Sequence, residues 1–350
     1  MKFNGRCIIE GRYLQDILDQ PNALNATFEK MAFPDELAVI KEQLHTGTIK
    51  RIVLTGMGSS FYILTPLYLA LANHGYEVVT SETSELIYYL EGLLNRQSLI
   101  ICVSQSGRSA EMIRLLEKNA GQAKLISITN SPMSPLARSS DAVLITHAGE
   151  EFSVSSKTYV AALLALEVLG GYLCDEDQKE VRDDLGQAAS AVASYLDAWR
   201  QHVFELAGYL DGTRHTFFVG RGRSLAAAGT GALITKESVG VHAEGMSSAA
   251  FRHGPMEMLT GDTFVGVLEG DEMTRNLNEH LKKDIILASG RSDLIGPGAG
   301  LASLRISSSS FRILSILEIL PLQMMTLALA YLSGTEAGLF TRATKVTITE

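Results

Sequence analysis

The chain has 350 residues, of which 46% are hydrophobic and 20% charged, and its formal net charge is −9. This composition is typical of a globular protein with room for two domains. The negative balance excludes a general nucleic-acid-binding surface, which needs basic side chains to meet phosphates, but it still allows a small anionic ligand held by a few local donors.

We expect neither a signal peptide nor a membrane span near the two ends of the chain. The stretch MKFNGRCIIEGRY has no apolar core, so we expect no signal peptide. The apolar stretch 311–332 contains Arg312, Glu318 and Pro321, which predicts a buried helix pair or a kinked helix rather than a membrane span. The cysteines follow no metal-ligand spacing, and we expect a reduced, cytoplasmic protein. They are Cys7, Cys102 and Cys174.

Buried strands followed by turns of small residues recur in the same order in both halves of the chain. In the first half these units lie at 51–60, 98–107, 124–132 and 142–151. In the second half we expect them at 216–224, 263–272, 284–292 and 304–310. Helix-like stretches separate the units, so the sequence predicts a duplicated α/β fold with two parallel sheets.

A helical stretch near 158–210 joins the halves, and its charged piece CDEDQKEVRDDLGQ is typical of a solvated surface. We therefore expect five segments along the chain. They are an N-terminal helical segment 1–40, a first α/β domain 41–175, a helical linker 176–205, a second α/β domain 206–335 and a C-terminal tail 336–350.

Two strand ends of the first half are rich in glycine and serine, GMGSS at 56–60 and SQSGRS at 104–109. Ligands of open parallel sheets bind at the carboxyl ends of strands, where helix N-termini offer unpaired N–H groups. The two loops therefore predict a phosphate cradle, although serine and glycine also form ordinary turns and caps. The matching loop of the second half, LEGDE at 268–272, carries three carboxylates that would repel a phosphate.

The stretch SVGVHAEGMSSAAFRHGP, preceded by Glu237, gathers two carboxylates and two imidazoles. It lacks an HExxH spacing, so we expect acid–base chemistry and no metal. In one straight helix, Glu237 and His253 would stand roughly 24 Å apart, too far for one sugar. The chain must therefore break, for which Gly245 and 247–248 are candidates, or the two groups must come from different subunits.

These motifs together resemble the sugar isomerase (SIS) domain family. The stretch 234–255 is similar to the isomerase half of glucosamine-6-phosphate synthase, and the segments 13–24, 150–159 and 343–350 resemble that family's entry segment, sugar loop and tail. The resemblance implies an α/β fold of two tandem SIS domains, each a parallel-sheet αβα sandwich with flavodoxin-like layering. It also implies chemistry without a metal or an organic cofactor.

The resemblance implies a role for each matched residue. Ser155 would touch the sugar, Glu237 would move a proton between C1 and C2, His253 would help to open the ring, and Lys345 would approach the carbonyl carbon. The family usually has an acidic residue at Arg108, so the cradle is more positive here, and an acidic substrate arm is left open. The residues matched to the 6-phosphate site are Gly58, Ser59, Ser60, Ser104, Gln105, Ser106 and Ser109.

Two departures narrow the expected activity. The synthase has a lysine three residues before the base, where this chain has Ile234, and no segment resembles the glutamine-hydrolysing domain. The resemblance therefore implies an enzyme that is not glutamine-dependent. We expect a deaminase or deglycase that cleaves the C–N bond of a 6-phospho amino sugar or phosphofructosamine through an enolamine.

Two alternatives stay open, an aldose–ketose isomerase of a phosphosugar and a non-catalytic sugar-phosphate sensor. The expected partners are a sugar 6-phosphate and a second copy of the chain. In that homodimer His253 would cross the interface to the neighbouring site. We expect no nucleic-acid or membrane partner.

Overall fold

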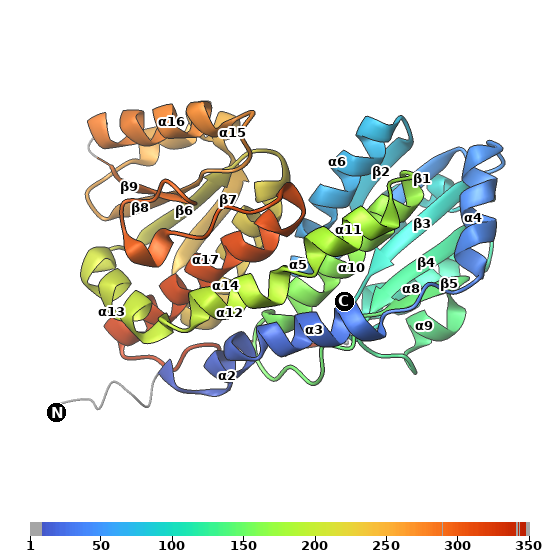
Figure 1. Ribbon diagram of the computed structural model, residues 1–350, viewed down its shortest axis with the longest axis horizontal. Coiled ribbons are helices and arrows are strands. Elements are labelled where there is room, and N and C mark those ends of the chain that lie inside the picture. The colour runs from blue at the N-terminus through green and yellow to red at the C-terminus, as the bar shows by residue number, and fades with distance from the viewer. Residues whose placement is uncertain (1–8, 289, 341, 343, 348–350) are drawn as a thin grey trace. The chain divides into compact units, whose positions relative to one another are not determined.

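The computed structural model describes residues 9–288, 290–340, 342 and 344–347. The chain divides into two compact units, each built on one parallel sheet (Figure 1). The five-stranded unit comprises 22–150, 157–186 and 342–350, and the four-stranded unit comprises 1–21, 151–156 and 187–341.

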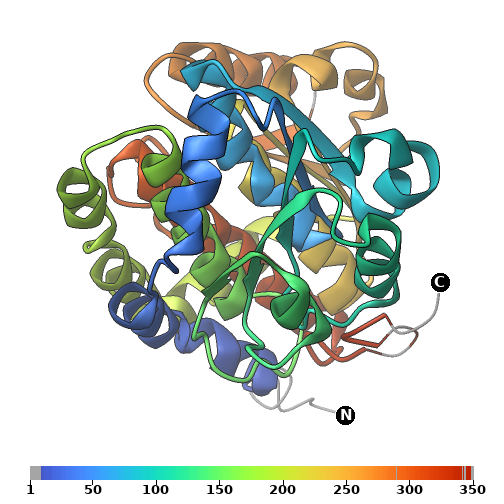
Figure 2. The same cartoon turned by 90° about the vertical axis from the view of Figure 1, so that its right-hand side faces the viewer.

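The five-stranded unit has the strand order β2-β1-β3-β4-β5, with every neighbouring pair parallel. Helices lie on both sides of this sheet (Figure 2). Its elements are α3 (Gln20–Lys30), α4 (Glu36–His45), β1 (Arg51–Gly56), α5 (Ser59–Tyr62), α6 (Leu64–His74), β2 (Glu77–Glu82), α7 (Thr83–Tyr89), η1 (Glu91–Leu93), β3 (Ser98–Val103), α8 (Ala110–Asn119), β4 (Lys124–Thr129), α9 (Pro135–Ser139), β5 (Ala142–Ile145), α10 (Lys157–Leu173) and α11 (Gln178–Leu185).

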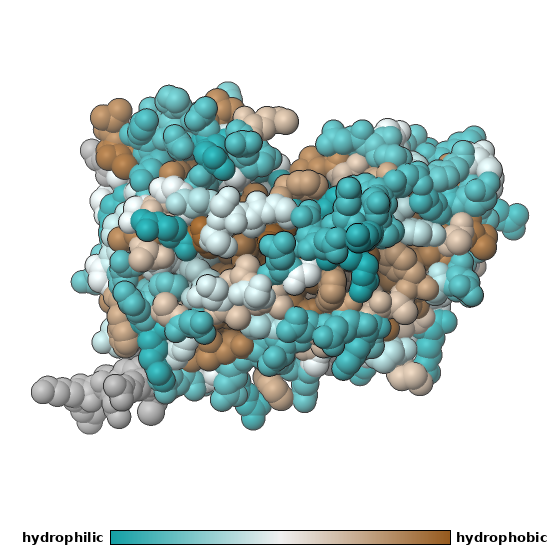
Figure 3. Space-filling model, in the orientation of Figure 1, coloured by the Kyte–Doolittle hydropathy of each residue, from teal (hydrophilic) through white to brown (hydrophobic). Residues whose placement is uncertain are grey.

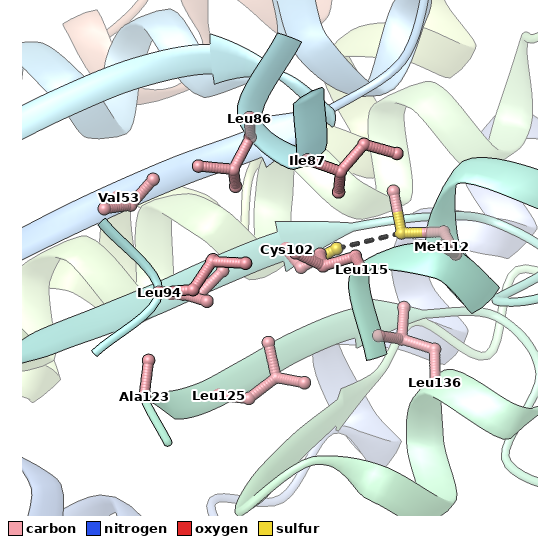
Figure 4. Packing of buried hydrophobic residues seen from close by; sticks show 11 residues of the cluster. Val53, Leu86, Ile87, Leu94, Cys102, Met112, Leu115, Ala123, Leu125 and Leu136 are labelled. Atoms are coloured by element: carbon pink, nitrogen blue, oxygen red, sulfur yellow. Dashed lines mark hydrogen bonds between the residues drawn. The ribbon is translucent and has the colours of Figure 1, made fainter. Parts of the chain in front are cut away.

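One face of this sheet packs against α7, α8 and α9 (Figure 4). The central strand β3 reads SLIICV and is buried at every position, as expected of a parallel strand covered on both faces. Its Cys102 meets Met112 of α8, with 3.1 Å between the sulfur atoms, and burial raises the pKa of this thiol to about 12. Apolar side chains from strands and helices thus hold the loops after β1 and β3 on a rigid base.

The four-stranded unit has the strand order β7-β6-β8-β9, again parallel. In chain order this repeats the arrangement β2-β1-β3-β4 of the other unit, which confirms the predicted duplication. Its elements are α2 (Arg12–Leu18), α12 (Ala188–Leu196), α13 (Trp199–Leu210), β6 (His215–Gly220), η2 (Gly222–Ser224), α14 (Leu225–Val239), β7 (His242–Ser247), α15 (Ser248–Arg252), η3 (Pro255–Met258), β8 (Thr263–Leu268), α16 (Arg275–Leu287), β9 (Arg291–Ile295), η4 (Ala302–Leu304) and α17 (Phe311–Ser333).

The apolar stretch near the C-terminus forms one continuous helix, α17, that runs through Pro321. The single helix rules out the helix pair, which was one of the two expected alternatives. By length and composition α17 is apolar enough to cross a membrane, but its most apolar 18 residues are entirely buried inside the protein, as in a core helix. Hydrophilic side chains cover most of the face shown in Figure 3.

The structure corrects the predicted strands at four places. Residues 284–287 end helix α16, and the strand follows at β9. Residues 304–310 form no strand, and two strands, β2 and β7, were missed. Both missed strands lie at a sheet edge, where half-exposed positions weaken the hydrophobic signal.

Candidate functional site

The first serine-rich loop begins where β1 ends at Gly56. A side chain there would place its Cβ 2.6 Å from the carbonyl oxygen of Ser60. Gly58 has a φ of 53°, which an L side chain rarely adopts, and it immediately precedes α5. The two glycines therefore fold the loop tightly, so that Ser59 and Ser60 open α5 with both residues partly exposed.

The second loop follows β3, the sheet neighbour of β1, so both loops lie at the same carboxyl edge. Ser104 is buried, and its hydroxyl accepts a hydrogen bond from the Gly107 N–H at 3.1 Å. A Cβ on Gly107, whose φ is 59°, would lie 2.3 Å from Ser134 Oγ. The loop leaves three predicted phosphate ligands partly exposed, namely Gln105, Ser106 and Ser109.

Close backbone packing fixes the helix that carries Glu237. A Cβ on Gly231 would lie 2.3 Å from a Leu322 methyl group of α17, and a Cβ on Gly245 of β7 would lie 2.3 Å from the Ala228 carbonyl oxygen. Small residues thus let α14 fit between β7 and α17. Glu237 lies in the last turn of α14 and is partly exposed.

A buried tyrosine lies near Glu237. Tyr13 of α2 is 1% exposed, and Thr326 of α17 contacts its hydroxyl at 3.2 Å. Burial raises the pKa of the Tyr13 phenol well above its usual value, and the carboxylates of Glu237 and Glu151 raise it further against the opposing hydrogen bond from Thr326. Tyr13 is therefore a neutral neighbour of the predicted base.

The residue after the predicted base is tied to the C-terminal segment. The Gly338 N–H donates to the Ser238 carbonyl at 3.0 Å, and Ser153 Oγ donates to the Gly338 carbonyl at 2.5 Å. Asp16 in turn accepts from the backbone N–H groups of Phe152 at 2.8 Å and Ser153 at 3.2 Å. These bonds join α2, the segment 151–156 and the end of α14 within the four-stranded unit.

Ser155, the predicted sugar contact, lies partly exposed in this segment. Beside it, Glu151 is 5% exposed and accepts from the N–H and hydroxyl of Ser156 at 2.9 and 3.2 Å. Sequence reasoning did not single out Asp16, Glu151 or Tyr13. Their only signal was membership of the segments 13–24 and 150–159, which were matched as stretches rather than residue by residue.

The chain breaks between Glu237 and His253. Of the two expected places, 247–248 is where a strand passes into a helix, whereas Gly245 is not a break, and a first break at Gly240 was not expected. Helix α14 ends at Gly240, whose φ is 67°, and Gly245 lies inside strand β7. The strand then passes at Ser247 into the short helix α15. His253 follows that helix and is exposed. The strand therefore separates the predicted acid from the predicted base, and their meeting in one site stays a prediction.

Lys345 belongs to the five-stranded unit and is partly buried. Two residues further on, the Thr347 carbonyl accepts from the Ala110 N–H at 3.1 Å, the first residue of α8. The tail thus lies beside the serine-rich loop after β3. Part of the matched tail, residues 343 and 348–350, lies outside the described residues, as does Cys7.

Polar side chains around the acidic loop of the second half pair with one another. Ser224, which follows β6, donates to Glu318 of α17 at 2.8 Å, and Glu269 pairs with Arg275 at 2.8 Å. Burial raises the pKa of Glu318 to about 8, with further raising by Asp271 and Glu269 against the hydrogen bonds from Ser224 and the Gly270 backbone.

Among the described residues, no group of three or more His, Cys, Asp or Glu side chains is arranged to hold a metal ion. His242 instead pairs with Glu244 at 3.5 Å on the exposed edge strand β7.

Comparisons with known proteins agree with this architecture. Residues 48–170 match the SIS domain. The chain is 29% identical over 340 residues to glutamine–fructose-6-phosphate aminotransferase (isomerizing) of Pyrococcus horikoshii, covering 92% of this chain and 55% of the relative. The chain thus spans about half the length of that relative.

Two solved structures share the fold over almost the whole chain. The C-terminal domain of glucosamine-fructose-6-phosphate aminotransferase from Francisella tularensis has a TM-score of 0.83 and 22% identity, covering 94% of this chain and 98% of that chain. Glucosamine-6-phosphate deaminase from Thermotoga maritima has a TM-score of 0.78 and 20% identity, with coverages of 97% and 100%. Both support two tandem domains of this type.

Proposed function

Because this chain contains a SIS domain followed by a second domain of the same strand order, we propose that it cleaves the C–N bond of a 6-phospho amino sugar or phosphofructosamine. In this proposal the loops after β1 and β3 hold the 6-phosphate through their serines. Ser155 touches the sugar, and Lys345 approaches the carbonyl carbon. The coarser assignment, a phosphosugar isomerase-type SIS protein, rests on the matched domain and the shared fold.

One observation carries the proposal. Glu237 is partly exposed in the last turn of α14, and it lies near enough to the buried Tyr13 for its charge to raise the pKa of that phenol. A carboxylate in partly buried surroundings suits proton removal from carbon. Binding the phosphate far from the reacting carbons would supply orientation.

The proposed reaction needs only an acid and a base. Glu237 takes a proton from the amine-bearing carbon while an acid protonates the neighbouring carbonyl oxygen, which gives an enolamine. A proton then returns to the former carbonyl carbon, so that the amine-bearing carbon becomes an iminium ion. Water adds to that iminium ion and the amine leaves. Ile234, in the place of the synthase lysine, is fully buried and apolar, which favours release of an amine over its synthesis.

The test is a coupled assay with purified protein. We would offer glucosamine 6-phosphate and 6-phosphofructosamine adducts and measure free amine and hexose 6-phosphate. Glu237→Gln should abolish amine release, and Glu272→Gln, at an exposed carboxylate of the same unit, should not. Ketose–aldose exchange without amine loss would instead identify an isomerase, and tight binding without turnover a sensor.

The exposed His253 supports a homodimer in which it serves the neighbouring site. Mixing the inactive variants Glu237→Gln and His253→Ala tests this directly. In an equal mixture, half of all dimers would contain one copy of each variant, and one of the two sites in such a dimer would regain both native groups. The mixture should therefore recover roughly a quarter of wild-type activity. No recovery despite subunit exchange would place both groups in the same subunit.

A further inference from the structure

Arg108 is a charged side chain that the proposed phosphate site does not use. It lies in the loop after β3 and is exposed. Its Nε donates to the Ser106 carbonyl at 3.4 Å, and its Nη2 donates to Ser131 Oγ at 3.3 Å. Ser131 follows β4, so the guanidinium bridges two neighbouring strand ends.

The order of the strands shows toward which strand end the Arg108 side chain points. Strand β3 lies between β1 and β4, and neighbouring strands are about 4.8 Å apart. The end of β4 therefore lies roughly 10 Å from the end of β1, where Ser59 and Ser60 stand. A phosphate held between the loops after β1 and β3 lies on one side of the β3 loop, and the Arg108 guanidinium points to the other side.

Arg108 keeps binding capacity on that side. A guanidinium has five N–H donors in a planar fork, and the two hydrogen bonds use only two of them. Within the described part of the chain, no carboxylate forms an ion pair with Arg108. The fork therefore retains an edge that could chelate a carboxylate with two parallel hydrogen bonds.

The neighbouring surface toward β5 is held in place. Asn130, beside Ser131, accepts from the Thr146 hydroxyl at 3.0 Å and the Ala148 N–H at 2.8 Å. Its amide also donates to the Gly149 carbonyl at 2.7 Å. These bonds fix residues 146–149, directly before the segment 150–159 that resembles the family's sugar loop, on the side to which Arg108 points.

We propose that Arg108 binds a carboxylate of the substrate that is separate from the 6-phosphate. The substrate is then an adduct of a phosphosugar with an amino acid rather than a simple 6-phospho amino sugar. This inference rests on the proposed function and chooses between its two substrate classes, the amino-acid adduct and the simple 6-phospho amino sugar. The predicted base and the phosphate loops would serve both classes equally.

Two ligands that differ only by a carboxylate test the inference, the 6-phosphofructosyl adducts of glycine and of methylamine. We would measure their affinities by calorimetry in the Glu237→Gln background, which prevents turnover. Arg108→Gln should weaken binding of the glycine adduct about ten- to hundredfold and leave the methylamine adduct within about twofold. Arg108→Lys, which keeps the charge but loses the fork, should recover only part of the affinity.

Arg96→Gln is the matched control, because Arg96 is exposed before β3 at the opposite edge of the same sheet. It should leave both affinities unchanged. Equal weakening of the two ligands by Arg108→Gln would assign Arg108 to the phosphate, and no weakening would remove it from the site. Either result overturns the inference while leaving the proposed function intact. Binding of neither ligand by protein with Arg108 intact refutes both.

Discussion

Replacing Gly245 by alanine tests the close packing that positions the predicted base. The new Cβ would lie 2.3 Å from the Ala228 carbonyl oxygen, 2.6 Å from its carbonyl carbon and 2.8 Å from Gly229 Cα. All three are backbone atoms of α14, so no side chain can move aside. The strand β7 and the helix must separate by about an ångström, which should cost about 3 kcal/mol.

Urea denaturation of wild type and Gly245→Ala would measure this cost. Gly208→Ala is the matched control, because Gly208 lies in helix α13 with no atom within 4 Å of its Cβ position. That variant should be unchanged or up to about 1 kcal/mol more stable. Because α14 carries Glu237, Gly245→Ala should also lose turnover under conditions where it remains folded. Wild-type stability in Gly245→Ala would refute the packing argument.

Three further predictions concern buried groups and the phosphate loop. Folding raises the pKa of Glu318 to about 8, so the native state holds a proton that the unfolded chain releases near its usual value of 4.5. The free energy of unfolding of the wild type should therefore fall as pH rises between 4.5 and 8, by up to about 1.4 kcal/mol per pH unit, relative to that of Glu318→Gln, which is always neutral. Urea denaturation at a series of pH values measures this, and parallel profiles of the two proteins would contradict the prediction. Asp16→Ala leaves two N–H groups of the segment 151–156 without their acceptor. It should lower the free energy of unfolding in urea denaturation by about 2–4 kcal/mol, and Asp16→Asn should lower it less. Equal losses of stability in the two variants would exclude the acceptor role. Gly107→Ala would push the new Cβ into Ser134, so the variant should bind hexose 6-phosphate at least tenfold more weakly in calorimetry. Wild-type affinity in this variant would show that the loop does not belong to the phosphate site.

The sequence predicted the duplication because central parallel strands leave a strong signal. Strands such as β3 are buried on both faces and read as continuous apolar runs. The run at 285–287 is also apolar, but only Ile285 faces the core, while Ile286 and Leu287 are exposed at the end of α16. Consecutive apolar residues on different faces of the helix end thus gave the same sequence pattern as a buried strand and led to the wrong prediction.

The loops of the candidate site could be predicted from the sequence, but the surroundings of Glu237 could not. Glycines and serines at strand ends have local causes, such as the positive φ of Gly58 and Gly107, and can be read from a short stretch. The environment of Glu237 is built from distant segments, since Tyr13 and Thr326 are separated by 313 residues along the chain. Contacts of that kind form only in the packed fold, and they produce no motif of fixed spacing in the sequence.

The duplication also explains why we place the phosphate in only one of the two domains. In the five-stranded unit most of the predicted phosphate ligands after β1 and β3 remain partly exposed, so their donors can meet a ligand. In the four-stranded unit the equivalent donors, Ser224 after β6 and the Gly270 N–H after β8, meet the buried carboxyl group of Glu318. A side chain of the protein thus takes there the place that an anion would take in the first domain. That domain is free to serve another task, and its helix α14 carries the predicted base.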